Sequence, residues 1–132
     1  MDSKTLVSHV MTPSPRTINI DQPLSVARKL MLEHNCRHLP VMDGSALVGI
    51  ISDRDIGIAT EVLKGTADDI LVRSVFVEQP FTVTSSTPLH EVLREMVTLH
   101  IGSALVVDKG KLVGIFTSMD GCSAFAEFLR NA

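Results

Sequence analysis

Glycine, a hydroxyl residue and aspartate recur at three-residue spacing in two segments of this sequence. A carboxylate at such a position can accept hydrogen bonds from two vicinal hydroxyls, as on ribose, while the hydroxyl and the free backbone N–H groups of a helix start can bind a phosphate. A glycine there avoids side-chain bulk where a ligand would approach. These residues are Gly49, Ser52 and Asp55 in the first segment and Gly114, Thr117 and Asp120 in the second.

The same spacing is also typical of a helix N-terminus without a ligand. Ser52 or Asp53 would then cap the next helix, and Asp55 would only complement the helix dipole. Because the pattern occurs twice at the same offset, we favour the ligand-binding interpretation over capping alone.

The two segments belong to an internal repeat with an offset of 65 residues. Leu47–Ser52 returns as Leu112–Thr117, and most of the chain follows the same offset. We therefore divide the sequence into repeat one, residues 1–65, and repeat two, residues 66–132. Two copies of this length indicate two supersecondary modules packed about a pseudo-twofold axis, with clefts for small ligands between them.

Each repeat has the hydrophobic pattern of a short helix, a strand, a helix, two strands joined by a tight turn, and a final helix. In repeat one we expect Asp21 or Gln22 to cap the helix that begins near Pro23, and an Asp43-Gly44 turn between the later strands. These elements predict an α+β fold, with helices layered on a mixed sheet in an α/β arrangement. The expected strands are residues 17–20, 38–42 and 46–51 in repeat one and 81–83, 103–107 and 111–116 in repeat two.

The composition is that of a globular protein and excludes several functional classes. With 45% hydrophobic and 20% charged residues and a net charge of -3, the 132-residue chain has no broad basic surface for nucleic acid. It has neither a basic leader before an apolar run nor an apolar segment of about 20 residues, so we expect a soluble cytoplasmic protein without a membrane partner. Cys36 and Cys122 do not match between repeats and lack CxxC spacing, which indicates reduced structural thiols.

No arrangement of residues predicts catalysis. His34 and His38 are four residues apart, as helical metal ligands would be, but Asn35 and Pro40 imply that the helix stops between them. The sequence has no Ser-His-Asp order and no Gly-x-Gly-x-x-Gly or His-Glu-x-x-His motif. The two repeated aspartates are expected in separate clefts, where they cannot act as an acid-base pair. We therefore expect no catalytic residue, no metal site and no enzymatic activity.

In their order along the chain, the motifs resemble those of a tandem pair of CBS (cystathionine-β-synthase) domains, often called a Bateman module. The resemblance is carried by Val10–Pro13, Cys36–Asp43 and Leu47–Asp55, and it covers nearly the whole chain. It implies two β-α-β-β-α units, adenine nucleotides or S-adenosylmethionine bound between them, and a homodimer. The sequence shows nothing beyond the pair, so it is similar to a stand-alone module.

The repeats differ in the basic residues that could meet a phosphate. An arginine offers a planar fork of donors to a phosphate, so we expect the cleft at repeat one to be the first choice for a nucleotide. The same side chains could instead reach a nucleotide held by repeat two, or be ordinary solvated or hydrogen-bonded surface residues. Repeat one has Arg37, His38 and Arg54, and the matching positions of repeat two are Gly102, Ser103 and Met119.

Apolar residues of the short strands are candidates for an adenine slot, although each is also typical of plain core. The segment Phe76-Val77-Glu78 stands in repeat two where repeat one has Met11-Thr12-Pro13, which argues against a requirement for that loop in the second cleft. The predicted ligand-binding set is Thr17, Ile18, Arg37, His38, Leu39, Pro40, Gly49, Ser52, Arg54 and Asp55 in repeat one and Thr82, Val83, Ser103, Ala104, Gly114, Thr117 and Asp120 in repeat two.

These observations predict a regulatory module that binds an adenosine-containing ligand, such as AMP, ADP, ATP, S-adenosylmethionine or NAD, and signals its occupancy to an unidentified protein target. No cofactor is expected to be required. The alternative is a ligand-independent dimerisation scaffold. The expected homodimer would form through the helices that carry Leu24, Ala27 and Met31 and Leu89, Val92 and Met96, or through their C-terminal counterparts.

Overall fold

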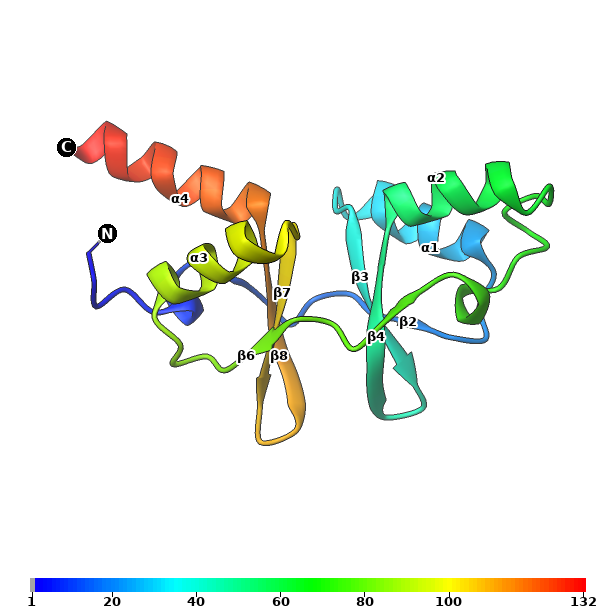
Figure 1. Cartoon of the computed structure of the whole chain (residues 1–132), viewed down its shortest axis with the longest axis horizontal. Coiled ribbons are helices and arrows are strands. Elements are labelled where there is room, and N and C mark those ends of the chain that lie inside the picture. Colours follow the sequence, from blue (N-terminus) through cyan, green and yellow to red (C-terminus); the bar gives the residue numbers. More distant parts are fainter. Residues whose placement is uncertain (1) are drawn as a thin grey trace. The chain divides into compact units, whose positions relative to one another are not determined.

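The computed structural model describes residues 2–132, and the chain divides into two compact units (Figure 1). The Asp55 unit is Arg16–Pro80, and the Asp120 unit combines the N-terminal segment up to Pro15 with Phe81–Ala132. The units therefore differ from the two sequence repeats. The segment of repeat one up to Pro15 belongs to the Asp120 unit, and residues 66–80 of repeat two belong to the Asp55 unit.

The Asp55 unit contains a four-stranded sheet in the order β2-β3-β4-β5. Strand β2 (Ile18–Asn19) runs parallel to β3 (His38–Asp43), and β4 (Ala46–Ser52) is antiparallel to both β3 and β5 (Val77–Glu78). Helices α1 (Leu24–Glu33) and α2 (Asp53–Val62) lie on one side of this sheet (Figure 1). A 3-10 turn, η2 (Val72–Ser74), precedes β5.

The Asp120 unit repeats this plan with the order β1-β8-β7-β6. Its strands are β1 (Thr12–Pro13), β6 (Thr82–Val83), β7 (Ser103–Asp108) and β8 (Lys111–Thr117), and its helices are η1 (Val7–His9), α3 (Leu89–Leu99) and α4 (Ser118–Asn131). Strand β6 is parallel to β7, and β8 is antiparallel to β7 and β1. Both units confirm the predicted α+β fold, with the added edge strands β1 and β5.

Two tight turns hold the central hairpins. In the first hairpin Gly44 alone has a positive φ, at 63°, whereas in the second both Lys109 and Gly110 have positive φ, at 51° and 77°. Both conformations belong to the two-residue turns whose twist matches that of the flanking strands. The hairpins therefore keep the same strand register, in which His38 pairs with Ser52 and Ser103 pairs with Thr117.

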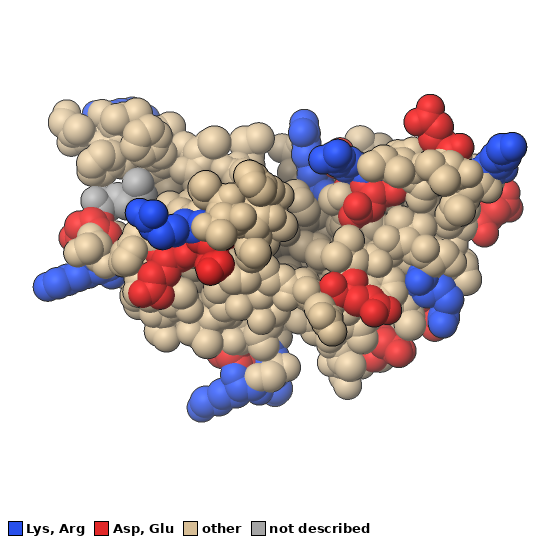
Figure 2. Space-filling model, in the orientation of Figure 1, with Lys and Arg blue, Asp and Glu red and all other residues tan. Residues whose placement is uncertain are grey.

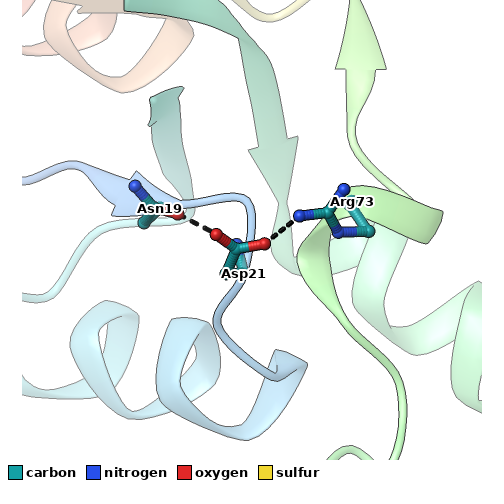
Figure 3. A network of polar contacts seen from close by, with 3 residues as sticks. All are labelled: Asn19, Asp21 and Arg73. Carbon is teal, nitrogen blue, oxygen red and sulfur yellow. Dashed lines mark hydrogen bonds and ion pairs between the residues drawn. The ribbon is translucent and has the colours of Figure 1, made fainter. Parts of the chain in front are cut away.

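The segment that precedes β5 is fixed to the Asp55 unit by backbone hydrogen bonds. The N–H of Leu24 donates to the Ile70 carbonyl at 2.8 Å, and the N–H of Val72 donates to the Gln22 carbonyl at 2.8 Å. Figure 3 shows an added polar network in which the Arg73 guanidinium pairs with Asp21, while the Asp21 N–H donates to Asn19 Oδ1 at 3.0 Å. This ion pair is exposed and contributes only about 0–1 kcal/mol, so the backbone hydrogen bonds are the main attachment of this segment to the unit.

The two units fill matching positions of their cores with side chains of different size. In the Asp55 unit Ile51 of β4 and Ile56 of α2 are both fully buried. Their counterparts in the Asp120 unit are Phe116, also fully buried, and Gly121, where an added Cβ would lie 3.3 Å from the Phe116 ring. The larger strand residue therefore fills the space that a helix residue fills in the other unit. As a result α4 buries no side chain in its own unit, whereas α2 buries Ile56 and Ala59.

Two expectations about the helices are wrong. The first residue before α1 is Pro23, which makes no side-chain cap, so neither Asp21 nor Gln22 caps that helix. The residues named first for a dimer contact are buried inside their own units, because the stripes of α1 and α3 face the sheets rather than solvent. They are Leu24, Ala27, Met31, Leu89, Val92 and Met96, each at most 6% exposed.

Candidate functional site

The strand-to-helix turn of the Asp55 unit forms a closed capping box. Ser52 is the N-cap of α2, and its Oγ accepts the Asp55 N–H at 3.1 Å. The Asp55 carboxylate returns the contact, since its Oδ2 accepts the Ser52 N–H at 2.9 Å. This pair satisfies two backbone donors that a helix start would otherwise leave free. The Asp55 carboxylate is thereby held at the positive end of α2.

The turn of the Asp120 unit has the same box with one more contact. Thr117 Oγ1 accepts the Asp120 N–H at 3.3 Å, and Asp120 Oδ2 accepts the Thr117 N–H at 3.0 Å. The Thr117 hydroxyl also donates to Asp120 Oδ2 at 3.2 Å. The capping alternative left open by the spacing is therefore realised at both turns, and it leaves part of each carboxylate outside the box.

The neighbouring edge strand distinguishes the two turns. In the Asp120 unit the Thr12 hydroxyl of β1 donates to Asp120 Oδ1 at 3.1 Å. The matching residue beside the Asp55 turn is Val77 of β5, which pairs with Ile50 as Thr12 pairs with Ile115. A valine has no donor, so within residues 2–132 Asp55 Oδ1 accepts no hydrogen bond.

This placement reverses one expectation about the loops. The departure from Met-Thr-Pro at Phe76-Val77-Glu78 was assigned to the cleft of repeat two, but the structure pairs that segment with β4 of repeat one. Met11-Thr12-Pro13 lies instead beside β8 of repeat two. No local pattern in the sequence identifies Thr12 and Val77 as site neighbours, because each belongs to one repeat and pairs with a strand of the other.

The two repeated glycines are both closely packed by the chain itself, but only Gly49 is packed against backbone. Neither lies at the end of its strand, since Gly49 is within β4 and Gly114 is within β8. A Cβ on Gly49 would lie 2.2 Å from the Val77 carbonyl oxygen, and one on Gly114 would lie 2.4 Å from the Met11 sulfur. Strand β5 therefore explains Gly49 without a ligand, whereas the flexible Met11 side chain could move away from a Cβ at Gly114. A ligand contact at either position stays a prediction.

Basic and acidic side chains gather at the Asp55 turn. The Asp53 N–H donates to the Arg37 carbonyl at 3.0 Å, which joins the start of α2 to the start of β3. Arg37 and Arg54 are both exposed, and within residues 2–132 neither guanidinium has an ion-pair or hydrogen-bond partner. Two exposed arginines therefore belong to the chain segments that meet at this turn, since Arg37 precedes β3 and Arg54 lies in the first turn of α2. Elsewhere on the face shown in Figure 2, positive and negative side chains are interspersed.

His38 is the half-buried member of this group. Burial lowers the pKa of His38 below its ordinary value, and nearby Arg37 acts in the same direction, while Asp53 and Asp55 oppose the shift. The imidazole is therefore neutral near pH 7 and can act as a hydrogen-bond donor or acceptor rather than as a cation. The corresponding Ser103 pairs with Thr117 but carries no charge.

The apolar candidates for an adenine slot are mostly core residues. Val83 is partly buried, and the other apolar candidates have almost no exposed surface. A ligand would therefore meet their backbone groups rather than their side chains. The buried candidates are Ile18, Leu39, Pro40 and Ala104. Thr17 and Thr82, which belong to the ligand-binding set but not to the adenine slot, are exposed.

Within residues 2–132, no cluster of three or more histidine, cysteine or acidic side chains is arranged to hold a metal ion. None of the helices in this described part combines the length and apolar character needed to cross a bilayer. The chemistry that the turns offer is thus hydrogen bonding from a carboxylate, a hydroxyl and helix N–H groups, with arginines at one of them.

Comparison with known proteins gives a family match over both repeats. The family model described as CBS domain matches residues 7–57 and 72–127. The chain is 35% identical over 128 residues to a CBS domain-containing protein of Dictyostelium discoideum, covering 89% of this chain and 88% of that protein. It is 34% identical over 118 residues to the L-aspartate semialdehyde sulfurtransferase of Methanocaldococcus jannaschii, covering 88% of this chain but only 22% of that enzyme.

Two solved structures with the same fold contain adenosine compounds. The CBS domain pair of the protein MJ0100, in complex with 5'-methylthioadenosine and S-adenosyl-L-methionine, has a TM-score of 0.82 and 30% identity, covering 93% of this chain and 97% of that chain. CBSX2 in complex with AMP has a TM-score of 0.75 and 26% identity, with coverage of 93% and 97%. The family model spans most of both repeats, and the chain therefore belongs to the CBS domain family, with two CBS domains in tandem.

Proposed function

We propose that this protein is a regulatory module that binds an adenosine-containing ligand at its strand-to-helix turns. The observation that carries the proposal is the Asp55 carboxylate, which a capping box holds at a helix start while its Oδ1 remains without a partner among the described residues. Complexes of two structural neighbours with adenosine compounds support the ligand class.

Each polar group of the Asp55 turn has a role that suits part of such a ligand. The carboxylate accepts hydrogen bonds from the two ribose hydroxyls, which is a charge-assisted contact. The Ser52 hydroxyl and the free N–H groups of α2 meet a phosphate, together with Arg37 and Arg54. The adenine edge meets backbone groups of the buried short strands. These are binding roles, so the proposal assigns no catalytic residue and no cofactor.

A ligand panel tests the proposal most directly. AMP, ADP, ATP, NAD and S-adenosylmethionine are each added while the thermal midpoint is measured. A ligand that binds only the folded protein at about 100 times its Kd stabilises it by about 2.7 kcal/mol, so at least one member should raise the midpoint. No rise with any member or with adenosine would contradict the proposal.

The first prediction assigns the ribose contact. Asp55→Asn keeps an oxygen for the Ser52 N–H but replaces the unpartnered oxygen with a donor, so it should weaken adenosine binding without removing the helix cap. Loss of one contact to a charged acceptor corresponds to roughly 1.5–3 kcal/mol, or about 10- to 150-fold in affinity by calorimetry. Asp55→Ala should weaken binding similarly but also lower stability by about 1 kcal/mol, because the cap is lost.

The matched control is Asp43→Asn, which makes the same charge change at the exposed end of β3. It should bind adenosine like the parent. The ribose assignment is wrong if Asp55→Asn, Asp120→Asn and the double variant all retain the parent's affinity.

A second function is favoured by apolar side chains on the outer helices. Ile58 and Val62 of α2 and Phe125 and Leu129 of α4 are each at least 51% exposed. In this alternative the chain is a scaffold that assembles with a second copy or a protein target and needs no ligand. A stable dimer whose thermal midpoint no ligand of the panel changes would favour the scaffold. A rise of the thermal midpoint with an adenosine compound would reject the scaffold as the sole function.

A further inference from the structure

The two carboxylates differ in how many acceptor positions the chain itself occupies. A carboxylate offers about four such positions. Asp120 uses three of them, for the Thr12 hydroxyl at 3.1 Å and for the N–H and hydroxyl of Thr117 at 3.0 Å and 3.2 Å. Within residues 2–132, Asp55 uses one, for the Ser52 N–H at 2.9 Å. A ribose with two vicinal hydroxyls needs two free positions, which Asp55 has and Asp120 lacks.

The difference comes from one residue in each edge strand. Thr12 and Val77 occupy the same place in β1 and β5. Each pairs with the residue two positions before the hydroxyl residue of its turn: Thr12 with Ile115, and Val77 with Ile50. Threonine and valine have the same branched shape, so the strands keep their geometry while only threonine supplies a donor. The hydrogen bond from Thr12 to Asp120 therefore depends on the side chain at this position and not on the fold.

We infer that Thr12 is an internal competitor for the Asp120 site, so that adenosine fills the Asp55 site first and the Asp120 site only after the Thr12 hydroxyl has left. This inference rests on the proposed function and concerns its regulation. The apparent affinity of the Asp120 site is reduced by the fraction of molecules in which Thr12 holds the carboxylate. Ligand binding at the Asp120 site also breaks the hydrogen bond between Thr12 of β1 and Asp120 at the start of α4. The ligand concentration therefore affects how firmly β1 is held at the edge of that sheet.

Reciprocal substitutions test the inference. Thr12→Val, made in an Asp55→Asn background that leaves one ribose acceptor site, should tighten adenosine binding at Asp120 by about five-fold in calorimetry, the value of one hydrogen bond. Val77→Thr, made in an Asp120→Asn background, should weaken adenosine binding at Asp55 by a similar factor. Adenosine is the probe because it lacks the phosphate that the arginines would bind.

A ligand-free measurement tests the contact itself. Thr12→Val and Asp120→Ala should each lower the thermal midpoint, and the double variant should lose about 3 °C less than the sum of the two, because both remove the same hydrogen bond. Additive shifts, or unchanged adenosine affinity in both reciprocal variants, would overturn the inference while leaving the proposed function in place. If the parent and every variant bind no adenosine, the proposed function fails and the inference fails with it.

Discussion

The capping and ligand-binding interpretations of the Ser52–Asp55 spacing are compatible at the level of single atoms. The capping box uses Oδ2 of Asp55 and the hydroxyl of Ser52, and it leaves Oδ1 free among residues 2–132. A carboxylate that is already oriented by a backbone N–H loses little side-chain freedom when it binds a ligand. The cap is therefore a support for the proposed ribose contact rather than an alternative to it.

The arginines at the Asp55 turn lead to a second prediction. Arg37→Ala combined with Arg54→Ala should reduce the affinity for ATP by about ten-fold while adenosine binding changes little, because only ATP carries the phosphates. The loss should shrink as salt rises, since screening weakens exposed charge pairs but scarcely affects ribose or adenine contacts. Calorimetry at low and high salt measures both effects.

The matched control is Arg28→Ala, which removes an exposed arginine of α1 and should retain the parent's ATP affinity. Equal losses for adenosine and ATP at every salt concentration would mean that Arg37 and Arg54 support the fold and not a phosphate.

The half-buried His38 leads to a third prediction, on pH dependence. Because the folded protein holds the pKa of His38 below the ordinary 6.5, the unfolded chain binds this proton more readily. The contribution of His38 to stability is therefore complete above about pH 6.5 and is lost as the pH falls through 6.5 toward the lower folded pKa. His38→Gln should show a smaller loss of stability than the parent between pH 7.5 and pH 5.5, by denaturant unfolding at about equal salt.

His34→Gln, the same substitution at an exposed position, is measured over the same pH range as the control for His38→Gln. An identical pH dependence in the parent and His38→Gln would show that protonation of His38 does not contribute to stability.

At the scale of elements, two glycines on neighbouring elements should respond oppositely to alanine. Gly49→Ala places a Cβ 2.2 Å from a backbone carbonyl of β5, so it should destabilise the protein by about 3 kcal/mol, the upper end for overpacking. Gly57→Ala, within α2 and with nothing within 4 Å of the new Cβ, should stabilise it by about 0.5–1 kcal/mol. Denaturant unfolding of both variants measures the two changes in the free energy of unfolding. A Gly49→Ala variant as stable as the parent would contradict the close packing of β5 on β4.

The final helix differs from its counterpart α2 in the residues that it buries. Phe116 fills the space above β8, so Gly121 faces it and α4 is left with Phe125 and Phe128 as a stacked pair with ring centroids 6.4 Å apart. Both rings remain at least 40% exposed. The spacing of Phe125, Phe128 and Leu129 along α4 suits burial, but all three side chains remain exposed on their own unit.

At the scale of the whole molecule, these exposed side chains support a prediction about assembly. We expect a homodimer formed through α2 and α4, because their apolar side chains are not covered by their own units. Phe125→Glu should lower the mass measured by light scattering at tens of micromolar protein toward that of one chain. Leu32→Glu, on the exposed face of α1, is the matched control and should retain the parent's mass.

A monomer mass for the parent protein would reject the homodimer. Dissociation of both variants to the same extent would instead mean that α4 has no special part in the contact.

The sequence by itself determined the local features of this protein. The 65-residue repeat is visible by comparing the sequence with itself. The alternating strands, the Asp-Gly turn and the Ser/Thr-x-x-Asp caps depend on residues close together in the chain, and the structure confirms the central hairpins and both helix starts. The ligand-binding set stays a prediction, and the structure shows only that His38 pairs with Ser52 and that the Arg37 carbonyl accepts the Asp53 N–H.

Only the tertiary structure decided which segments meet. Strands β1 and β5 are two residues long and carry no periodic pattern, so nothing local indicates that each pairs with the hairpin of the other repeat. That pairing lets the Thr12 hydroxyl bond Asp120 and places Val77 at the matching position of the Asp55 unit, and it explains Gly49 by packing against β5. Contacts between residues distant in sequence depend on the free energy of the whole fold, which spacing along the chain does not reveal.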